Sequence, residues 1–416
     1  MMGKLSLRTA GAFSLSLALL LSSSVFAHLP EFFGREYVLV KDGEPPPDPC
    51  GGDRDALRAE IEAQKELLEA QPADDGAYDI TLADPQGELA GLYARLCNHP
   101  AALKQLREAL QRLRISDGLL APSQLPILRA MADSYLAIGD VESAQLALRS
   151  TLRVHGMAVG SLSVEGLRDS LAYFRLARNI FIDPRGSRDV GLFFQAFQDN
   201  DEAWDRQLER KTAYEVLRGL GLSQLRNYYI LMGTNLSSGV VGSEAGGGAW
   251  DFLYRAQLLS YRQGIDILEV LATTAEEFAP QHVAEYQFRL GNWHMWNGKY
   301  RSACDAYALA WSLATPPAGD ALRKQMVQPA ELPEDEQLWD ALQSPEIPER
   351  AVIEASFSVS RRGDVSGMDA NAVGDGSEAL AGRLGRWLRD SHMRPAIING
   401  ECVAGELKGR RYRLLD

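Results

Sequence analysis

The sequence predicts a mainly α-helical protein: a helical-hairpin array followed by a small α+β domain with the order strand-strand-helix-strand. Three observations predict this fold class. Apolar residues recur at helical spacing from Asp53 onward. A hairpin-like unit then recurs through the middle of the chain. Beyond residue 350 the apolar residues alternate with a period of two, which is typical of a half-buried strand.

Composition and charge bound the classes of function. The chain has 416 residues, of which 46% are hydrophobic and 24% charged, so it has ample material for a folded core. Its formal net charge is −13. Nucleic-acid binding draws its affinity from Lys and Arg side chains that neutralise phosphates, so we expect no nucleic-acid partner.

The N-terminus has the three parts of a secretory signal, namely a basic start, an apolar middle and a small residue at the end. Lys4 and Arg8 precede an apolar run from residue 10 to 21, and Ala27 ends the segment. Because this run is shorter than the ~20 residues that span a bilayer, residues 1–27 are predicted to be a signal peptide. Cleavage would leave an exported protein. An uncleaved membrane anchor is the alternative, and only then would we expect membrane contact.

The cysteines are even in number, which in an exported chain permits two disulfides. They are Cys50, Cys97, Cys304 and Cys402. Three pairings are possible, and the pairing of Cys50 with Cys97 is favoured weakly because it closes the shorter loop. Buried free thiols are the alternative. No Cys-x-x-Cys motif occurs, so neither a zinc site nor a redox pair is predicted.

A proline-rich connector at residues 28–52 leads into the helical part, whose clearest unit runs from residue 284 to 317. In that unit Gly291 and Ala303 would let two helices approach closely, and Gly298 supplies the conformation that ends a helix. The order of small residues, aromatic residues, Gly turn and closing proline resembles the tetratricopeptide repeat, a family of antiparallel helix pairs.

Three further stretches follow the same pattern less closely. Residues 125–156 place Gly139 at the turn, and a register 34 residues upstream aligns Gly264 with Gly298. A fourth unit starts at Asp84 and turns at residues 98–100. The resemblance implies a tetratricopeptide-like array over residues 53–327, with unrelated helical hairpins as the alternative.

In such arrays the first helix of each pair lines a concave surface that receives a peptide or protein. The resemblance therefore implies that the following side chains point into a groove: Tyr254, Leu258, Tyr261, Phe288, Asn292 and Met295. Asn292 is the most suggestive, because a carboxamide can donate to and accept from a peptide backbone at once. The alternative is that the aromatic residues and Met295 belong to the core.

No catalytic motif is present. The glycine-rich stretch from residue 237 to 250 lacks the Gly-Lys-Ser/Thr of a phosphate loop, and no Gly-x-Ser-x-Gly elbow occurs. The six histidines have no metal-ligand spacing. We therefore predict no catalytic residue, no metal and no cofactor. Residues 160–247 keep no repeat register, and an enzyme with an unrecognised site there remains an alternative.

A change of composition follows the array. Residues 328–350 contain four prolines and seven acidic residues against one arginine, which predicts a solvated linker. The C-terminal domain is expected over residues 351–416.

That domain combines an alternating first strand, a Gly-Asp turn, a second strand, an amphipathic helix and a last alternating strand. The residues that mark these parts are Ile353, Ala355, Phe357, Val359, Gly363, Val365, Leu384, Trp387, Arg394, Pro395, Ala396, Asn399 and Gly400. Their order resembles the C-terminal domain of the TonB family of energy transducers. The resemblance covers about residues 350–416.

In that family the domain lies in the periplasm and adds a peptide strand from an outer-membrane transporter to its edge. The resemblance implies that the final strand is the pairing edge, with Arg411 and Arg413 exposed and Tyr412 and Leu414 in the core. The chain departs from the family because helices replace the long proline-rich arm and the N-terminal segment looks cleavable. Transmission of force from a membrane motor is therefore in doubt.

Taken together, these features predict a periplasmic, non-enzymatic scaffold of a Gram-negative bacterium. Its partners would be proteins or peptides of the cell envelope, with an outer-membrane transporter among the candidates. An anchored TonB-like transducer is the first alternative, and the envelope enzyme is the second.

Overall fold

The computed structural model describes most of the chain, in several ranges. The described residues are 37–39, 53–70, 79–158, 162–182, 189–234, 247–335, 338, 352–373 and 378–414. The predicted signal peptide at residues 1–27 lies outside these ranges.

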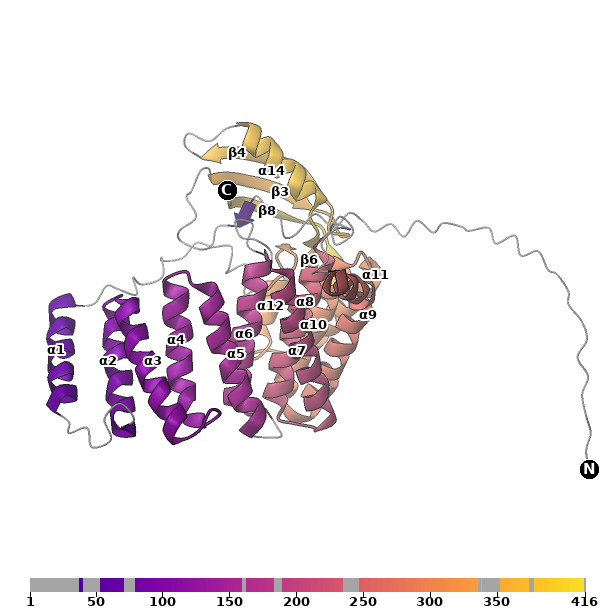
Figure 1. The fold of residues 1–416 in the computed structure, drawn as a ribbon. Coiled ribbons are helices and arrows are strands. Elements are labelled where there is room, and N and C mark those ends of the chain that lie inside the picture. The colour runs from indigo at the N-terminus through magenta and orange to yellow at the C-terminus, as the bar shows by residue number, and fades with distance from the viewer. Residues whose placement is uncertain are drawn as a thin grey trace, which may run out of the picture.

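Helices make up most of the structure, and consecutive helices lie side by side along the array (Figure 1). Their bounds are α1 (Arg54–Ala70), α2 (Ala83–Arg95), α3 (His99–Ser116), α4 (Leu125–Ala137), α5 (Val141–Ala158), α6 (Val164–Ile182), α7 (Val190–Glu209), α8 (Tyr214–Met232), α9 (Gly247–Phe278), α10 (Val283–Trp296), α11 (Tyr300–Leu313) and α12 (Asp320–Met326). One apolar core runs from α2 through α11, because each helix buries its apolar stripe against its neighbours.

Three predicted turns between helices are confirmed. Gly139 between α4 and α5 has φ 76°, and Gly298 between α10 and α11 has φ 67°, a region that glycine enters without a steric penalty. Between α2 and α3 the Asn98 side chain caps α3 by accepting from the Ala101 N–H. These turns reverse the chain and set the paired helices antiparallel.

The predicted turn at Gly264 is wrong. Gly264 lies in the middle of α9, which continues through it as a single helix. Its role is packing, because a Cβ built on it would lie 2.3 Å from Cε2 of Trp293. Likewise, a Cβ built on Gly291 of α10 would lie 2.3 Å from Cε1 of Tyr307 on α11. Glycine is thus used here for close approach between helices and not to end a helix.

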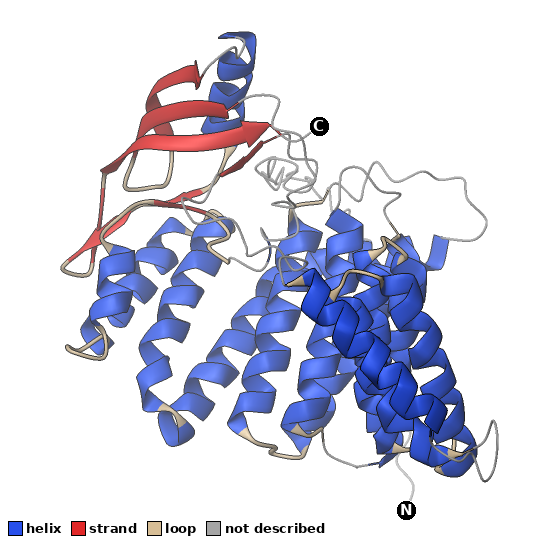
Figure 2. Ribbon diagram, turned by 90° about the vertical axis from the view of Figure 1, so that its left-hand side faces the viewer, coloured by secondary structure: helices blue, strands red, loops and turns tan. Residues whose placement is uncertain are grey.

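The C-terminal domain is a small sheet with one helix, and it has an apolar core of its own. It consists of β3 (Val352–Val359), β4 (Val365–Val373), α14 (Glu378–Asp390) and β8 (Gly405–Leu414), in the order that the sequence predicts. All pairs are antiparallel, and Ile353, Ala355, Phe357 and Val359 of β3 face the core as expected. Figure 2 shows the sheet lying over one end of the helices.

A fourth strand joins this sheet from the other end of the sequence. Strand β1 (Tyr37–Leu39) pairs antiparallel with the end of β8, so the sheet order is β1-β8-β3-β4. The register joins Tyr37 to Leu414, Val38 to Arg413 and Leu39 to Tyr412. Part of the predicted proline-rich connector is therefore an edge strand of the C-terminal sheet.

Four short strands tie the two parts together. Strand β2 (Ala330–Glu331) pairs with β5 (Met393–Arg394), and β6 (Ala396–Ile398) pairs with β7 (Glu401–Val403). The acidic stretch predicted to be a solvated linker is packed over its described residues, because Leu332 and Leu338 are buried. Likewise, Ile397 of β6 joins the core of the array and not that of the sheet.

A disulfide reinforces this junction. Cys304 of α11 is bonded to Cys402 of β7, 98 residues apart in sequence. Cys97 is also disulfide-bonded, while the Cys50 of the favoured pairing lies outside the described residues. Within the described ranges, no helix has the length and apolar character needed to cross a membrane.

Candidate functional site

The predicted groove residues of α10 lie at the junction between the array and the C-terminal segments. Phe288, Asn292 and Met295 are 3%, 4% and 1% exposed, so none of them lines an open surface. The Asn292 carboxamide accepts from the Tyr307 hydroxyl at 2.9 Å and donates to Glu334 at 3.5 Å. The carboxamide thus contacts side chains of its own chain, whereas the sequence predicts a contact with the backbone of a bound peptide.

Arg394 is the centre of this junction. Its side chain is 1% exposed and lies with its guanidinium carbon 5.1 Å from the ring centre of Phe288. Nε and Nη2 donate to the two carboxylate oxygens of Glu334 at 3.0 and 3.3 Å. Nη1 and Nη2 also donate to the carbonyls of Met326 and Gln325, at the end of α12. One buried cation thus joins β5, α10, α12 and the acidic segment.

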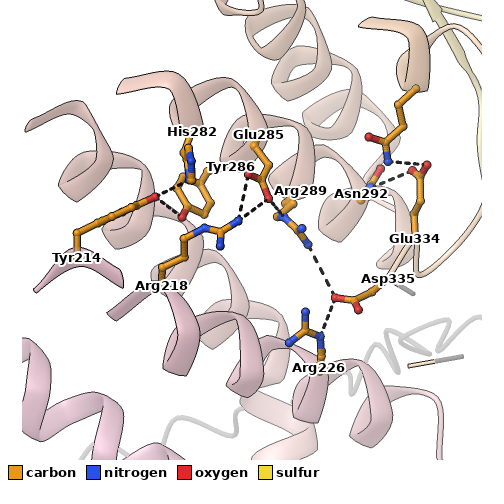
Figure 3. Close-up of polar contacts among 11 residues, drawn as sticks. Tyr214, Arg218, Arg226, His282, Glu285, Tyr286, Arg289, Asn292, Glu334 and Asp335 are labelled. Atoms are coloured by element: carbon orange, nitrogen blue, oxygen red, sulfur yellow. Dashed lines mark hydrogen bonds and ion pairs between the residues drawn. The ribbon is translucent and has the colours of Figure 1, made fainter. Parts of the chain in front are cut away.

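The neighbouring acid, Asp335, lies beside two other arginines, Arg226 and Arg289 (Figure 3). Arg226 of α8 donates from Nε to Asp335 Oδ2 at 2.8 Å, and Nη1 of Arg289 on α10 lies 3.9 Å from the same oxygen. The side chains of Arg226 and Asp335 are only 12% and 10% exposed. We call Arg226, Phe288, Arg289 and Asn292 the α8/α10 face, and the acidic segment covers it.

The polar network continues along α8 and α10 through Glu285. Arg289 donates to it at 2.8 Å, and Arg218 lies 3.5 Å away. Burial alone would raise the pKa of Glu285, but Arg289 and Arg218 outweigh that effect and hold the pKa below its usual value. Glu285 therefore keeps its negative charge and orients the two arginines.

A tyrosine pair closes the far end of this network. The hydroxyls of Tyr214 and Tyr286 are 2.5 Å apart, and Nδ1 of His282 lies 3.1 Å from the Tyr214 hydroxyl. Burial raises the pKa of Tyr286 and of Tyr214, so both stay protonated at neutral pH. Protonated phenols at this point join α8 to α10 and supply no base.

The other predicted groove residues lie apart from this junction. Tyr254 on α9 is 45% exposed. Tyr261, about two turns further along α9, is half-buried, and its hydroxyl lies 3.1 Å from Nδ1 of His294. The structure thus brings together Phe288, Asn292 and Met295, and does not bring Tyr254 to them.

The predicted pairing edge has neighbours on both sides at its end. Within β8, Arg411 pairs with Glu354 of β3, and Arg413 pairs with Val352 of β3 and Val38 of β1. Arg411 is exposed and Arg413 half-buried, while Tyr412 is 1% exposed and packs in the core. The side chain of Leu414 lies outside what is described.

Residues that sequence reasoning did not single out carry much of the geometry. They are Arg226, Arg289, Glu334 and Asp335. Arg394 was singled out only as part of the TonB-like pattern, with no role predicted at this junction. The only sequence signal was the adjacent acidic pair in a proline-rich stretch, which composition alone places in solvent. Across the described ranges, no cluster of three or more His, Cys, Asp or Glu could hold a metal ion.

Comparisons with models of known protein families and with curated protein sequences each found no match to this chain.

Proposed function

We propose that the chain is an exported, periplasmic scaffold that binds protein or peptide partners of the cell envelope and performs no catalysis. In this proposal the helices form a tetratricopeptide-like array and the C-terminal part is a TonB-like domain. The partner adds an extended strand to the edge of β8.

The pairing of β1 with β8 is the observation that carries this proposal. A segment more than 360 residues away in sequence supplies backbone groups to the edge of β8. An edge strand offers unpaired N–H and C=O groups that accept another strand. Strand β8 lies between β1 and β3, and β1 pairs with only three of its 10 residues. This pairing supports strand addition at β8. In the proposal, β1 is an internal segment that competes with the partner for the same backbone groups.

Other observations support the array and the export. The α10–α11 pair has a close crossing at Gly291, a Gly298 turn and a buried Tyr307, which fits the repeat resemblance. The disulfide between Cys304 and Cys402 fits an oxidising compartment.

The junction favours the scaffold over the transducer. A transducer domain works at the end of a long extended arm, whereas here an ion pair, a disulfide and a buried β6 strand fasten the domain to the array. A partner bound at β8 would therefore be held at a fixed position relative to the helices.

Strand addition can be tested with a peptide that copies residues 35–41, which include β1. The variant Val38→Pro removes a backbone donor from β1 and weakens its hold on β8. We expect the fluorescent peptide to bind this variant about tenfold more tightly than the unmodified protein, because the internal strand no longer competes. Fluorescence anisotropy measures both affinities.

A copy of the peptide with methylated backbone nitrogens is the control, since it keeps the side chains and cannot donate to a strand. Equal binding of the two peptides, or no binding to either form of the protein, would contradict strand addition. A photoreactive residue at Arg411 should crosslink to the peptide, and one at Asn371 on β4, the opposite edge, should not.

Location is tested separately. The expected result is a soluble envelope protein that begins at His28. An intact N-terminus recovered in the inner membrane would instead support the anchored transducer.

A further inference from the structure

A cavity of about 400 Å³ lies between α5, α6 and α7, and none of the junction residues lines it. Four arginines contribute to its lining: Arg149 and Arg153 from α5, and Arg206 and Arg210 from the end of α7. Each pair is four residues apart on or beside its helix, so both members share one face. The two pairs thus meet the cavity from two different helices.

These guanidinium groups are poorly compensated. Arg149, Arg153 and Arg210 form no ion pair with any residue in the described ranges, and Arg206 has only Glu202 at 3.7 Å. Asp199 is the one carboxylate in the lining. Burial raises the pKa of Asp199, against smaller opposing effects that include Arg149 and Arg206. Even with Asp199 ionised, the four arginines exceed the carboxylates of the lining. The cavity is therefore positive, in a chain whose net charge is −13.

Apolar and uncharged groups line the rest of the cavity. Leu152 and Phe174 contribute apolar surface, and Phe174 is 2% exposed. His155 also lines it, with Nε2 held 2.8 Å from Asp169, and Asp169 is itself paired with Arg129 at 2.7 Å. Among the lining residues, Asp199 is the only carboxylate beside the four arginines.

We propose that this cavity binds a compact ligand with two or more phosphate groups. A guanidinium donates two parallel hydrogen bonds to a phosphate, and several guanidiniums that line one cavity from two helices favour a ligand with several anionic groups close together. The volume falls within the range of about 300 to 1,000 Å³ that is usual for small-ligand sites. Such phosphate groups belong either to a soluble oligophosphate or to a lipid headgroup. The inference is independent of strand addition at β8.

Titration calorimetry with inorganic tripolyphosphate tests the site, at about 50 mM salt so that screening is moderate. The double variant Arg153→Gln/Arg210→Gln should bind at least about tenfold more weakly, because it loses two forks and two charges. Both side chains are exposed, so an unchanged melting temperature is expected. The variant Arg153→Lys/Arg210→Lys keeps the charges without the guanidinium forks. Its affinity for tripolyphosphate should lie between those of the unmodified protein and the double Gln variant.

Arg301→Gln is the matched control, since Arg301 is exposed on α11 and does not line the cavity. Its affinity for tripolyphosphate should equal that of the unmodified protein. In a second arm, vesicles of phosphatidylcholine with cardiolipin replace tripolyphosphate in a flotation assay. Arginine-dependent binding of tripolyphosphate alone assigns a soluble ligand, and arginine-dependent binding of vesicles assigns a headgroup. No binding in either arm, or equal binding by the double variant and Arg301→Gln, would overturn the proposal.

Discussion

Arg394 and Glu334 form an ion pair that joins the C-terminal domain to the helical array. Nε of Arg394 lies 3.0 Å from Oε2 of Glu334, and the two side chains are 1% and 21% exposed. The same guanidinium donates to two carbonyls at the end of α12, which have lost their partners within the helix. A single side chain therefore satisfies a partly buried carboxylate and two helix-terminal acceptors.

Removing this cation should destabilise the protein strongly. Arg394→Met keeps much of the volume, but it leaves Glu334 without its main cation and two carbonyls without donors. Breaking a buried pair from one side costs about 3–5 kcal/mol of the free energy of unfolding. Urea denaturation followed by circular dichroism measures the loss. Arg386→Met on α14 is the control, because Arg386 is exposed, and it should change the stability by less than about 0.5 kcal/mol. Equal stability of the two variants would show that the pair does not hold the domain.

The features that sequence could predict are those that depend on neighbours in the chain. The turn at Gly298 follows from a residue that tolerates positive φ, and the first strand of the C-terminal domain follows from its period of two. Helix α14 follows from one apolar stripe, of which Leu384 and Leu388 are fully buried. These local rules suffice for the mainly helical array and the small terminal sheet.

What sequence missed depends on contacts between distant residues. Glu334 and Asp335 look like solvated acids in a proline-rich stretch, and only the folded chain places Arg226 and Arg394 opposite them. In the sequence, Gly264 could either end a helix or allow two helices to cross closely. Only the folded chain, with the indole of Trp293 against Gly264, shows that the second is the case. A three-residue strand such as β1 carries too little pattern to be assigned before its partner is known.

The disulfide should hold the β6–β7 hairpin on the array. Closing a loop of this length removes about 4–5 kcal/mol of unfolded-state entropy in the chain model, and measured effects are commonly about 2–4 kcal/mol. We expect the double variant Cys304→Ala/Cys402→Ala to lose about 2–4 kcal/mol of the free energy of unfolding. Hydrogen exchange should show faster exchange for Ile397 and its neighbours, with little change in α2 and α3. Uniform exchange throughout would mean that the bond does not act locally.

Acidification should weaken the junction through His392. Its ring packs edge-on against Trp296 with centres 5.4 Å apart, and burial lowers its pKa, against a smaller opposing effect of Asp364. The native state therefore binds fewer protons at this site than the unfolded state, whose pKa is about 6.5. The stabilisation is complete above that pH and is lost as the pH falls toward the native pKa.

His392→Gln should remove this part of the pH dependence. As the pH falls from about 7.5 to about 5.5, the variant should lose less free energy of unfolding than the unmodified protein does. Urea midpoints at the two pH values measure it. Carboxyls that titrate in the same range, such as Asp201 with its pKa raised by burial to about 6, affect both proteins equally and cancel in the difference. A constant difference across this range would exclude His392 as a titrating group.

Two glycine substitutions should have opposite effects on stability, because one glycine lies where α9 contacts α10 and the other lies on an open face of α2. Gly264→Ala would place a Cβ 2.3 Å from the indole of Trp293, whose side chain is fully buried and donates to the Tyr261 carbonyl at 2.9 Å. Overpacking of this kind costs about 1–3 kcal/mol. Gly91→Ala on α2 meets nothing within 4 Å and should stabilise the protein by about 0.5–1 kcal/mol through helix propensity. Thermal unfolding distinguishes the two, and a gain in stability for both variants would show that Gly264 is an ordinary helical position and not a point of helix contact.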